Sequence, residues 1–285
     1  MPSSITHELI ARDAIALFPE ELQRVCNTNY DYYILGAQGP DVYFFYRFLQ
    51  KKEINLGKYM HRNRTYDVFT YFKEHAKEER ILAYVVGFVV HYATDATFHP
   101  LVYALLDESG AYKMEHQQIE NDWDVYFERR KREMEVTNHF FPFSSKRLKR
   151  ENVLYEFLNP LMKELSRKPL KKGKMRKGVK TFCLYNRFFH GKHCYEHQRR
   201  FDKMGRFFHT KRKLARLFPR ENPNEEYLSG EKLERLANIH TIGELYDRAV
   251  QTAGELCNTF YACAQSGEPL PKEPFNKSYL TAEQQ

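Results

Sequence analysis

The sequence lacks the patterns that mark disulfide-stabilised and membrane-spanning proteins. Its five cysteines are an odd number and include no CxxC pair, which is typical of reduced thiols in a cytoplasm. The longest apolar run, residues 81–90, is about half of the roughly 20 residues that a membrane-spanning helix needs. The first twenty residues have no basic stretch ahead of an apolar one, so we expect no cleavable signal peptide. These absences together predict a soluble, cytoplasmic protein.

Patterns typical of β-strands and hairpins are also scarce. Apolar residues recur instead at the helical period, and the aromatic content of 15% suits a packed core rather than a disordered chain. The predicted fold is therefore all-α, as a single multi-helix domain over residues 1–285. Helices are expected from Thr6 or His7 to Phe18 and over 21–27, 61–79, 80–96, 114–136 and 241–265, with a short helix that ends near Gly110. Basic amphipathic helices are expected over 151–218, interrupted by an exposed turn over 168–178.

The charge is distributed unevenly along the chain. The net charge is +8, but residues 146–216 contain 23 Lys and Arg against 5 Asp and Glu, while the remainder contains 22 against 32. A basic helical segment (146–218) thus belongs to an otherwise acidic protein, and the two parts are expected to face different partners.

Polar side chains follow the apolar run in "ILAYVVGFVVHYATDATFHP" (81–100). His91 and Asp95 are four residues apart, so they lie on one face of a helix, and His99 follows one turn later. A buried carboxylate is costly unless it has a partner, such as a hydrogen bond, an ion pair or a metal ion. Downstream, His116 and Glu120 repeat the same spacing.

Two such pairs on successive helices can converge on one ion. Imidazole and carboxylate ligands without thiolate favour zinc, with iron and manganese as competitors. A single histidine on an apolar helix face is more simply interpreted as a hydrogen-bonded core residue, and a single HxxxE motif as a solvated pair on a helix surface. The conjunction of the two motifs favours metal binding.

The first 125 residues resemble the zinc-dependent phospholipase C family, whose fold is shared with single-strand-specific nucleases. The resemblance rests on "THELIARDA", "GAQGPDVYFF", "KYMH" and "HYATDATFHP" and on the ligand types in their order. The matching residues are His7, Asp41, His61, His91, Asp95, His99, His116 and Glu120.

The resemblance implies an all-helical zinc enzyme with two to three ions. Asp41, His61, His91 and Asp95 would bind one zinc; Asp95 would bridge to a second held by His7; and His99, His116 and Glu120 would hold the third. It also implies hydrolysis of a phospholipid to a diacylglycerol and a phosphorylated headgroup. Asp41 would be the catalytic residue that positions or deprotonates the attacking water, or else a ligand only.

The resemblance leaves three functions open. In the family the amine of the mature first residue is also a ligand, whereas this chain begins Met-Pro-Ser-Ser, so a non-catalytic zinc-binding, membrane-associated module is one alternative. A nuclease or other phosphodiesterase is the second. The HxxxE form of the last pair favours the phospholipase, because the nuclease branch typically has HxxxD.

The basic segment allows several functional interpretations. Residues 182–218 interleave aromatic with basic side chains, as membrane-surface helices and single-strand nucleic-acid binders do. A solvated face over a helical core is the simplest reading, followed by an anionic membrane surface and then by nucleic acid. His190, His193, Cys194 and His197 form a further metal candidate, and the aromatic run 43–46 a candidate substrate pocket.

Overall fold

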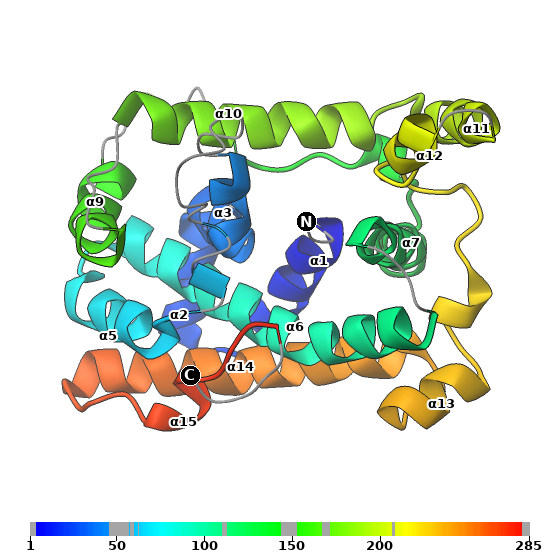
Figure 1. The fold of residues 1–285 in the computed structure, drawn as a ribbon. Helices are drawn as coiled ribbons and strands as arrows, with labels where there is room; N and C mark the ends of the chain where they lie inside the picture. Colours follow the sequence, from blue (N-terminus) through cyan, green and yellow to red (C-terminus); the bar gives the residue numbers. More distant parts are fainter. Residues whose placement is uncertain are drawn as a thin grey trace. The chain divides into compact units, whose positions relative to one another are not determined.

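The computed structural model describes residues 4–45, 57, 60–61, 63–109, 113–143, 153–166, 172–206 and 209–280. Over these ranges the chain is helical (Figure 1), and β-structure is limited to isolated bridges such as Ser229–Thr241. The all-α prediction is confirmed. The elements are α1 (Ser4–Ala14), η1 (Ile15–Leu17), α2 (Glu20–Thr28), α3 (Tyr30–Ala37), η2 (Gly39–Phe45), α5 (Thr65–His75), α6 (Glu79–Ser109), α7 (Lys113–Arg132), η3 (Val136–Asn138), α9 (Val153–Ser166), α10 (Lys172–Phe189), α11 (Cys194–Gly205), α12 (His209–Ala215), η4 (Glu225–Tyr227), α13 (Glu231–Ala237), α14 (Ile242–Ser266) and α15 (Lys272–Phe275).

The chain divides into two compact units, each made of three chain segments. Unit 1 comprises Met1–Leu9, Phe98–Phe140 and Leu184–Arg248, and unit 2 comprises Ile10–Thr97, Phe141–Cys183 and Ala249–Gln285. Each unit is described by itself below. The single domain over 1–285 stays a prediction.

The apolar run that precedes His91 forms part of the core of unit 2. Phe88 packs edge-on against Phe72 and Phe69, with ring centroids 5.1 and 6.2 Å apart. The residues around it on α6 are fully buried, namely Ala83, Val85, Val86, Val89 and Val90. Burial of such side chains contributes about 1.5–3 kcal/mol each. The run is therefore apolar because it packs α6 into the core.

Two glycines allow α3 to lie close to α6. An added Cβ on Gly36 would collide with the carbonyl oxygen of Tyr84, and one on Gly87 with the carbonyl oxygen of Tyr33. Only glycine permits this backbone approach at both positions. The contact brings the C-terminal end of α3 to the helix face that carries His91.

The core of unit 1 is built around the single tryptophan. Trp123 of α7 packs edge-on against Phe98 of α6 at 5.2 Å, and its Nε1–H donates to the carbonyl oxygen of Tyr227 at 2.9 Å. Phe127, one turn later on α7, lies 4.7 Å from the ring of Tyr246. These contacts fix the rotation of α7 about its axis and thus the direction in which its polar residues point.

The helix expected over 80–96 and the short helix expected to end near Gly110 form one continuous helix. α6 continues to Ser109 with Pro100 inside it. A proline inside a helix costs about 3 kcal/mol, because it lacks the N–H and clashes with the preceding turn. Leu101, Val102 and Leu105 are buried beyond it, and their burial offsets that cost. By length and composition α6 would also pass for a membrane span, but 83% of its most apolar window is buried inside the protein.

The turn expected over 168–178 is wrong for residues 172–178, which are helical. α10 begins at Lys172, while residues 167–171 lie outside the described residues. Burial of Val179 and Phe182 anchors a helix whose first turns are basic, which composition alone did not indicate.

A buried ionic group ties α1 to α7 in unit 1. His139 follows η3, and its side chain is only 2% exposed. Its Nδ1 lies 3.0 Å from Glu128 of α7 and its Nε2 lies 3.0 Å from Glu8 of α1. Arg132 approaches both carboxylates at 3.7 Å. Because both acids are buried, loss of the central cation would leave two buried negative charges that Arg132, at 3.7 Å from each, compensates only in part.

This group makes stability depend on pH. Burial alone would lower the pKa of His139, but Glu128 and Glu8 raise it to about 9 from an ordinary 6.5. Other charged or titratable residues close to this group include Arg132 and His190. A raised pKa stabilises the fold below pH 6.5, and this contribution is lost as the pH rises through 9. We expect His139→Gln to lower the free energy of unfolding by about 2 kcal/mol more at pH 6.5 than at pH 9.5. Urea unfolding at the two pH values measures this difference.

The matched control is His193→Gln, since the side chain of His193 is 58% exposed and its loss is expected to change stability little at either pH. A destabilisation by His139→Gln that is the same at both pH values would contradict the charged state assigned to His139.

Candidate metal centre

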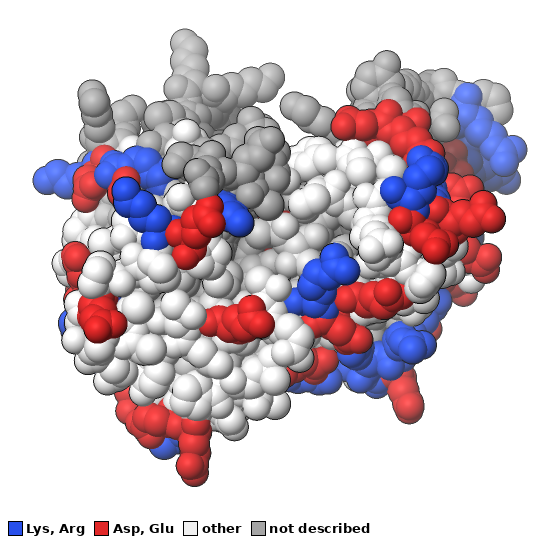
Figure 2. Space-filling view, turned by 90° about the horizontal axis from the view of Figure 1, so that it is seen from below, with Lys and Arg blue, Asp and Glu red and all other residues white. Residues whose placement is uncertain are grey.

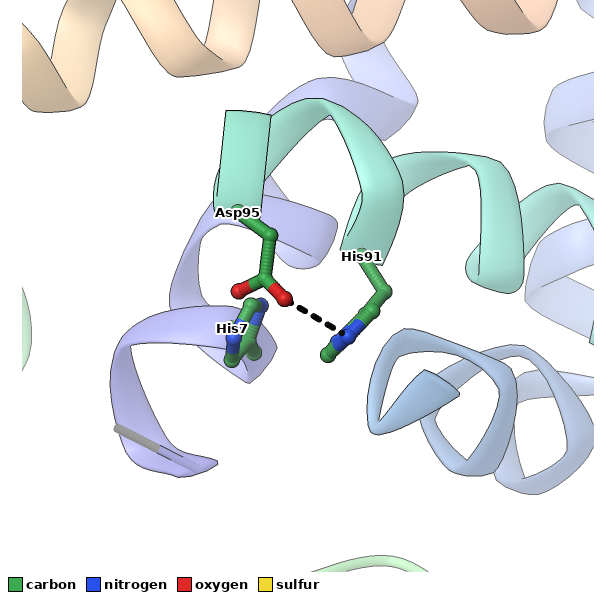
Figure 3. A group of neighbouring side chains, drawn as sticks. All are labelled: His7, His91 and Asp95. Carbon is green, nitrogen blue, oxygen red and sulfur yellow. Dashed lines mark ion pairs between the residues drawn. The ribbon is translucent and has the colours of Figure 1, made fainter. Parts of the chain in front are cut away.

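Histidine and carboxylate side chains form three groups in which one ligand atom of each residue lies within 4.8 Å of the others. All eight residues singled out from the sequence occur in these groups, and the described part of the chain contains no further group of this kind. The groups are His7, His91 and Asp95 (Figure 3); Asp41, His61 and His91; and His99, His116 and Glu120.

Four of these residues are linked by close contacts within unit 2. His61 Nε2 lies 3.1 Å from Asp41 Oδ1 and 3.3 Å from Asp95 Oδ2. His91 Nε2 lies 3.2 Å from the same Asp95 oxygen, along the dashed line in Figure 3. All four side chains are at most 6% exposed. The i, i+4 prediction for His91 and Asp95 is confirmed, and Asp41 reaches them from η2.

Backbone carbonyls orient both histidine rings. His91 Nδ1 lies 3.1 Å from the carbonyl oxygen of Ala37, at the end of α3, and His61 Nδ1 lies 2.6 Å from that of Gly57. A carbonyl only accepts, so Nδ1 of each ring carries a proton and Nε2 faces the carboxylates. Nε2 donates to them when the ring is protonated, and it offers its lone pair to a metal ion when the ring is neutral. Gly39, at φ +50°, lies against the ring of His91, where an added Cβ would collide with it. Such outer contacts fix the tautomer and direction of metal-binding histidines.

The electrostatics of this group favour a cation. Burial would lower the pKa of His61, but the neighbouring Asp41 and Asp95 raise it to about 10. Asp41 is 1% exposed, and apart from the ion pair of Oδ1 with His61 its carboxylate oxygens accept no hydrogen bond from the described residues. A buried carboxylate in this state costs several kcal/mol unless a cation compensates it. The residues present therefore fit a bound metal ion.

The third group lies in unit 1. Glu120 Oε1 is 2.9 Å from His116 Nε2, one turn before it on α7, and 3.7 Å from His99 Nε2 on α6. The Glu120 side chain is 5% exposed, and its Oε2 accepts no hydrogen bond within the described ranges. Oε2 of Glu120 is thus a buried carboxylate oxygen that is available to bind a cation. The His-x3-Glu pair predicted from the sequence thus meets His99.

Aromatic residues that the sequence did not single out lie against these groups. Tyr279 packs on His61 and His91 in unit 2, with ring centroids 5.3 and 6.1 Å apart, and Tyr103 lies 6.0 and 5.8 Å from His99 and His116 in unit 1. Burial raises the pKa of Tyr279, which keeps the ring a neutral, apolar wall. Residue 279 lies beyond the last helix expected from the sequence, and no motif identified it.

The aromatic run 43–46 only partly contributes to the site. Tyr43 is buried, and its hydroxyl lies 3.4 Å from that of Tyr84, as a core residue. Phe44 lies 5.4 Å from the ring of His61 and remains a candidate pocket residue. The side chains of Phe45 and Tyr46 lie outside the described residues.

The second metal site suggested by the sequence does not form among the described residues. Within the described ranges His190, His193, Cys194 and His197 form no group of three ligands. His190 is buried, whereas His193 is exposed and pairs with Glu196.

The ligand chemistry of the assembled groups is uniform. They offer imidazole nitrogens and carboxylate oxygens without sulfur, a set that suits zinc and, less selectively, iron or manganese. The arrangement can hold cations and polarise a bound anion such as a phosphate ester.

Comparison with known proteins agrees with this chemistry. The family model for zinc-dependent phospholipase C matches residues 6–175, more than half of the chain and all eight candidate ligands. No curated protein and no solved structure gives a significant match. The family supports a zinc enzyme that hydrolyses phospholipids. On this match, the chain belongs to the zinc-dependent phospholipase C family.

Proposed function

We propose that the protein is a phosphodiester hydrolase of the phospholipase C type, which releases diacylglycerol and a phosphorylated headgroup from a phospholipid. The observation that carries this proposal is the set of buried carboxylates, each beside histidines, within the residues that the family model matches. Asp41 and Glu120 retain buried oxygens without hydrogen-bond partners among the described residues.

The proposed ligands fall into three sets. Asp41, His61, His91 and Asp95 would hold one zinc, and Asp95 together with His7 a second. His99, His116 and Glu120 would hold the third. The contacts within each group support these assignments, and the sharing of Asp95 follows the family resemblance.

Bound zinc would act as a Lewis acid on the phosphoryl oxygens and lower the pKa of a water molecule toward neutrality. Asp41 would orient that water and accept its proton. The water oxygen adds to phosphorus, the bond between phosphorus and the glycerol oxygen breaks, and the glycerol oxygen takes up a proton from solvent. Tyr279 and Phe44, which pack on His61, would limit access of bulk water to Asp41.

The first prediction concerns metal content. We expect about two to three zinc ions per chain in protein purified without chelator, as in sites with closely spaced metals. His61→Ala and His116→Ala should each lower the zinc content, since they remove ligands from different groups. Removal of zinc should also lower the melting temperature, because metal binding is coupled to folding. Elemental analysis and thermal unfolding measure both effects.

His193→Ala is the matched control, because this histidine is exposed and belongs to none of the three groups. A wild-type protein that is fully stable without metal, or zinc loss in the control equal to that in His61→Ala, would contradict the assignment.

The second prediction tests Asp41 as the group that accepts the proton. Asp41→Asn keeps the size and one ligand oxygen but removes the negative charge. We expect phosphodiester hydrolysis to fall by about 10² or more, the lower range for loss of a general base. Zinc content should fall only partly, since His61, His91 and Asp95 remain. Initial rates on phosphatidylcholine and on a soluble phosphodiester, measured beside zinc content, separate catalysis from metal loss.

Asp67→Asn serves as a control, because Asp67 is an exposed acid that pairs with Arg64 on the surface. Near-wild-type turnover in Asp41→Asn would remove Asp41 from the reaction. Absence of turnover in the zinc-loaded wild type would favour the non-catalytic module, and hydrolysis of single-stranded DNA alone would favour a nuclease.

We further propose a cytoplasmic protein that binds anionic membrane surfaces through the basic segment 146–216. On α10, Leu184 and Phe188 are 53% and 55% exposed, one turn apart, with the exposed Arg187 between them in sequence. Apolar side chains beside basic ones are typical of helices at a membrane surface. On the face shown in Figure 2, by contrast, acidic and basic side chains of the described residues are interspersed. The absence of disulfides among the five cysteines supports a reducing compartment.

Salt dependence tests this surface. We expect binding to phosphatidylserine vesicles to fall steeply as salt rises from about 0.05 to 0.5 M, because the Debye length shortens. Arg200→Glu with Lys203→Glu should weaken sedimentation with vesicles; both residues are exposed, whereas Arg199 is already paired with Glu221. Lys77→Glu with Arg248→Glu makes the same charge change at exposed positions outside the segment. Equal loss in both pairs, or binding that salt does not change, would contradict the proposal.

A further inference from the structure

Asp124 is a buried carboxylate on α7 that belongs to none of the three metal groups. It is fully buried and lies one turn after Glu120. Its oxygens accept hydrogen bonds from the backbone N–H of Thr6 at 2.7 Å and of Ile5 at 3.4 Å, and from the Thr6 hydroxyl at 2.8 Å. All these residues belong to unit 1.

These contacts attach the first turn of α1 to α7. The first N–H groups of a helix have no partner within the helix, and a carboxylate placed there also interacts favourably with the helix dipole. Hydrogen bonds from N–H and O–H donors to an ionised carboxylate are of the strong, charge-assisted kind. Ser4, at the start of the same helix, donates to Asn186 Oδ1 at 2.6 Å. The N-terminal end of α1 is thereby fixed at more than one point.

The residue that follows Thr6 is His7, the candidate ligand on α1. On its other side Glu8 contacts His139, which in turn contacts Glu128. His7 is therefore held between two residues that are each anchored to α7, Thr6 through Asp124 and Glu8 through His139. α7 also carries His116 and Glu120, eight and four residues before Asp124, respectively.

We propose that Asp124 is a positioning residue for His7, which sets the depth and rotation of α1 so that the imidazole reaches a metal ion. Useful metal–ligand distances vary by only about ±0.2 Å, so a small shift of this helix matters. One helix thus carries two ligands and places a third. This inference rests on the proposed role of His7 as a zinc ligand.

The test compares two buried aspartates on the same helix. Asp124→Asn keeps the size and one accepting oxygen but removes the charge. We expect it to weaken binding of the zinc that depends on His7 by about 10-fold, the lower range for residues that orient metal ligands. The measurement is zinc retained against a chromophoric chelator, and the His7-dependent zinc is defined by the difference between wild type and His7→Ala.

Asp122→Asn is the matched control. Asp122 is equally buried, but it accepts from Arg220 and from the backbone N–H of Asn224 instead of from α1. We expect this variant to lower thermal stability without changing zinc affinity. Thr6→Val is a milder variant that keeps the backbone hydrogen bond, and it should weaken the same zinc less than Asp124→Asn does.

The double variant His7→Ala with Asp124→Asn completes the test. If Asp124 acts through His7, the double variant should retain as much zinc as His7→Ala alone, because the interaction is already lost. Equal zinc affinity in Asp124→Asn and Asp122→Asn, or a further loss in the double variant, would overturn the positioning role. If His7→Ala itself retains all the zinc, the proposed ligand role of His7 fails, and this inference fails with it.

Discussion

This fold must accommodate carboxylates that are buried beside histidines. Asp41, Asp95 and Glu120 are almost completely buried, where an uncompensated charge would cost several kcal/mol. Neighbouring histidines can compensate this charge only while protonated, as the raised pKa of His61 shows. A metal ion compensates it with neutral imidazoles, and this requires Nδ1–H to point at a backbone carbonyl and Nε2 at the ion. The contacts of His61 with Gly57 and of His91 with Ala37 meet that requirement.

The scaffold follows from this requirement. α6 is strongly apolar before His91 because the helix must be anchored in a core before it can present polar residues at a buried position. Gly36 and Gly87 let α3 approach α6, so the carbonyl of Ala37 can orient His91. On α7, Trp123 and Phe127 fix the helix rotation, so His116 and Glu120 face His99 while Asp124 faces α1.

The metal groups could be predicted from the sequence because their spacing is local. His91 with Asp95 and His116 with Glu120 are pairs four residues apart, and a helix places such pairs on one face whatever surrounds it. The family resemblance supplied His7, Asp41 and His61, whose separation in sequence gave no geometric signal. The continuation of α6 through Pro100 could not be predicted, since it depends on the burial of Leu101 and Val102 outweighing a local breaker. Likewise, the charged composition of α7 did not indicate that Asp124 and Glu128 are fully buried. Their partners, Thr6 and His139, are not their neighbours on the helix, so the local sequence carries no sign of these contacts.

X-ray absorption at the zinc edge of the purified protein is the decisive measurement for the metal centre, because it reports the metal's ligands without reference to activity. We expect a shell of nitrogen and oxygen ligands at about 2.0–2.2 Å and no sulfur. We also expect scattering from a second metal at about 3.5–4 Å, the separation of ions in two-metal sites. Sulfur scattering at about 2.3 Å would place zinc on cysteines. That result, or a zinc-free protein, would contradict the assignment of the buried histidines and carboxylates as the metal centre.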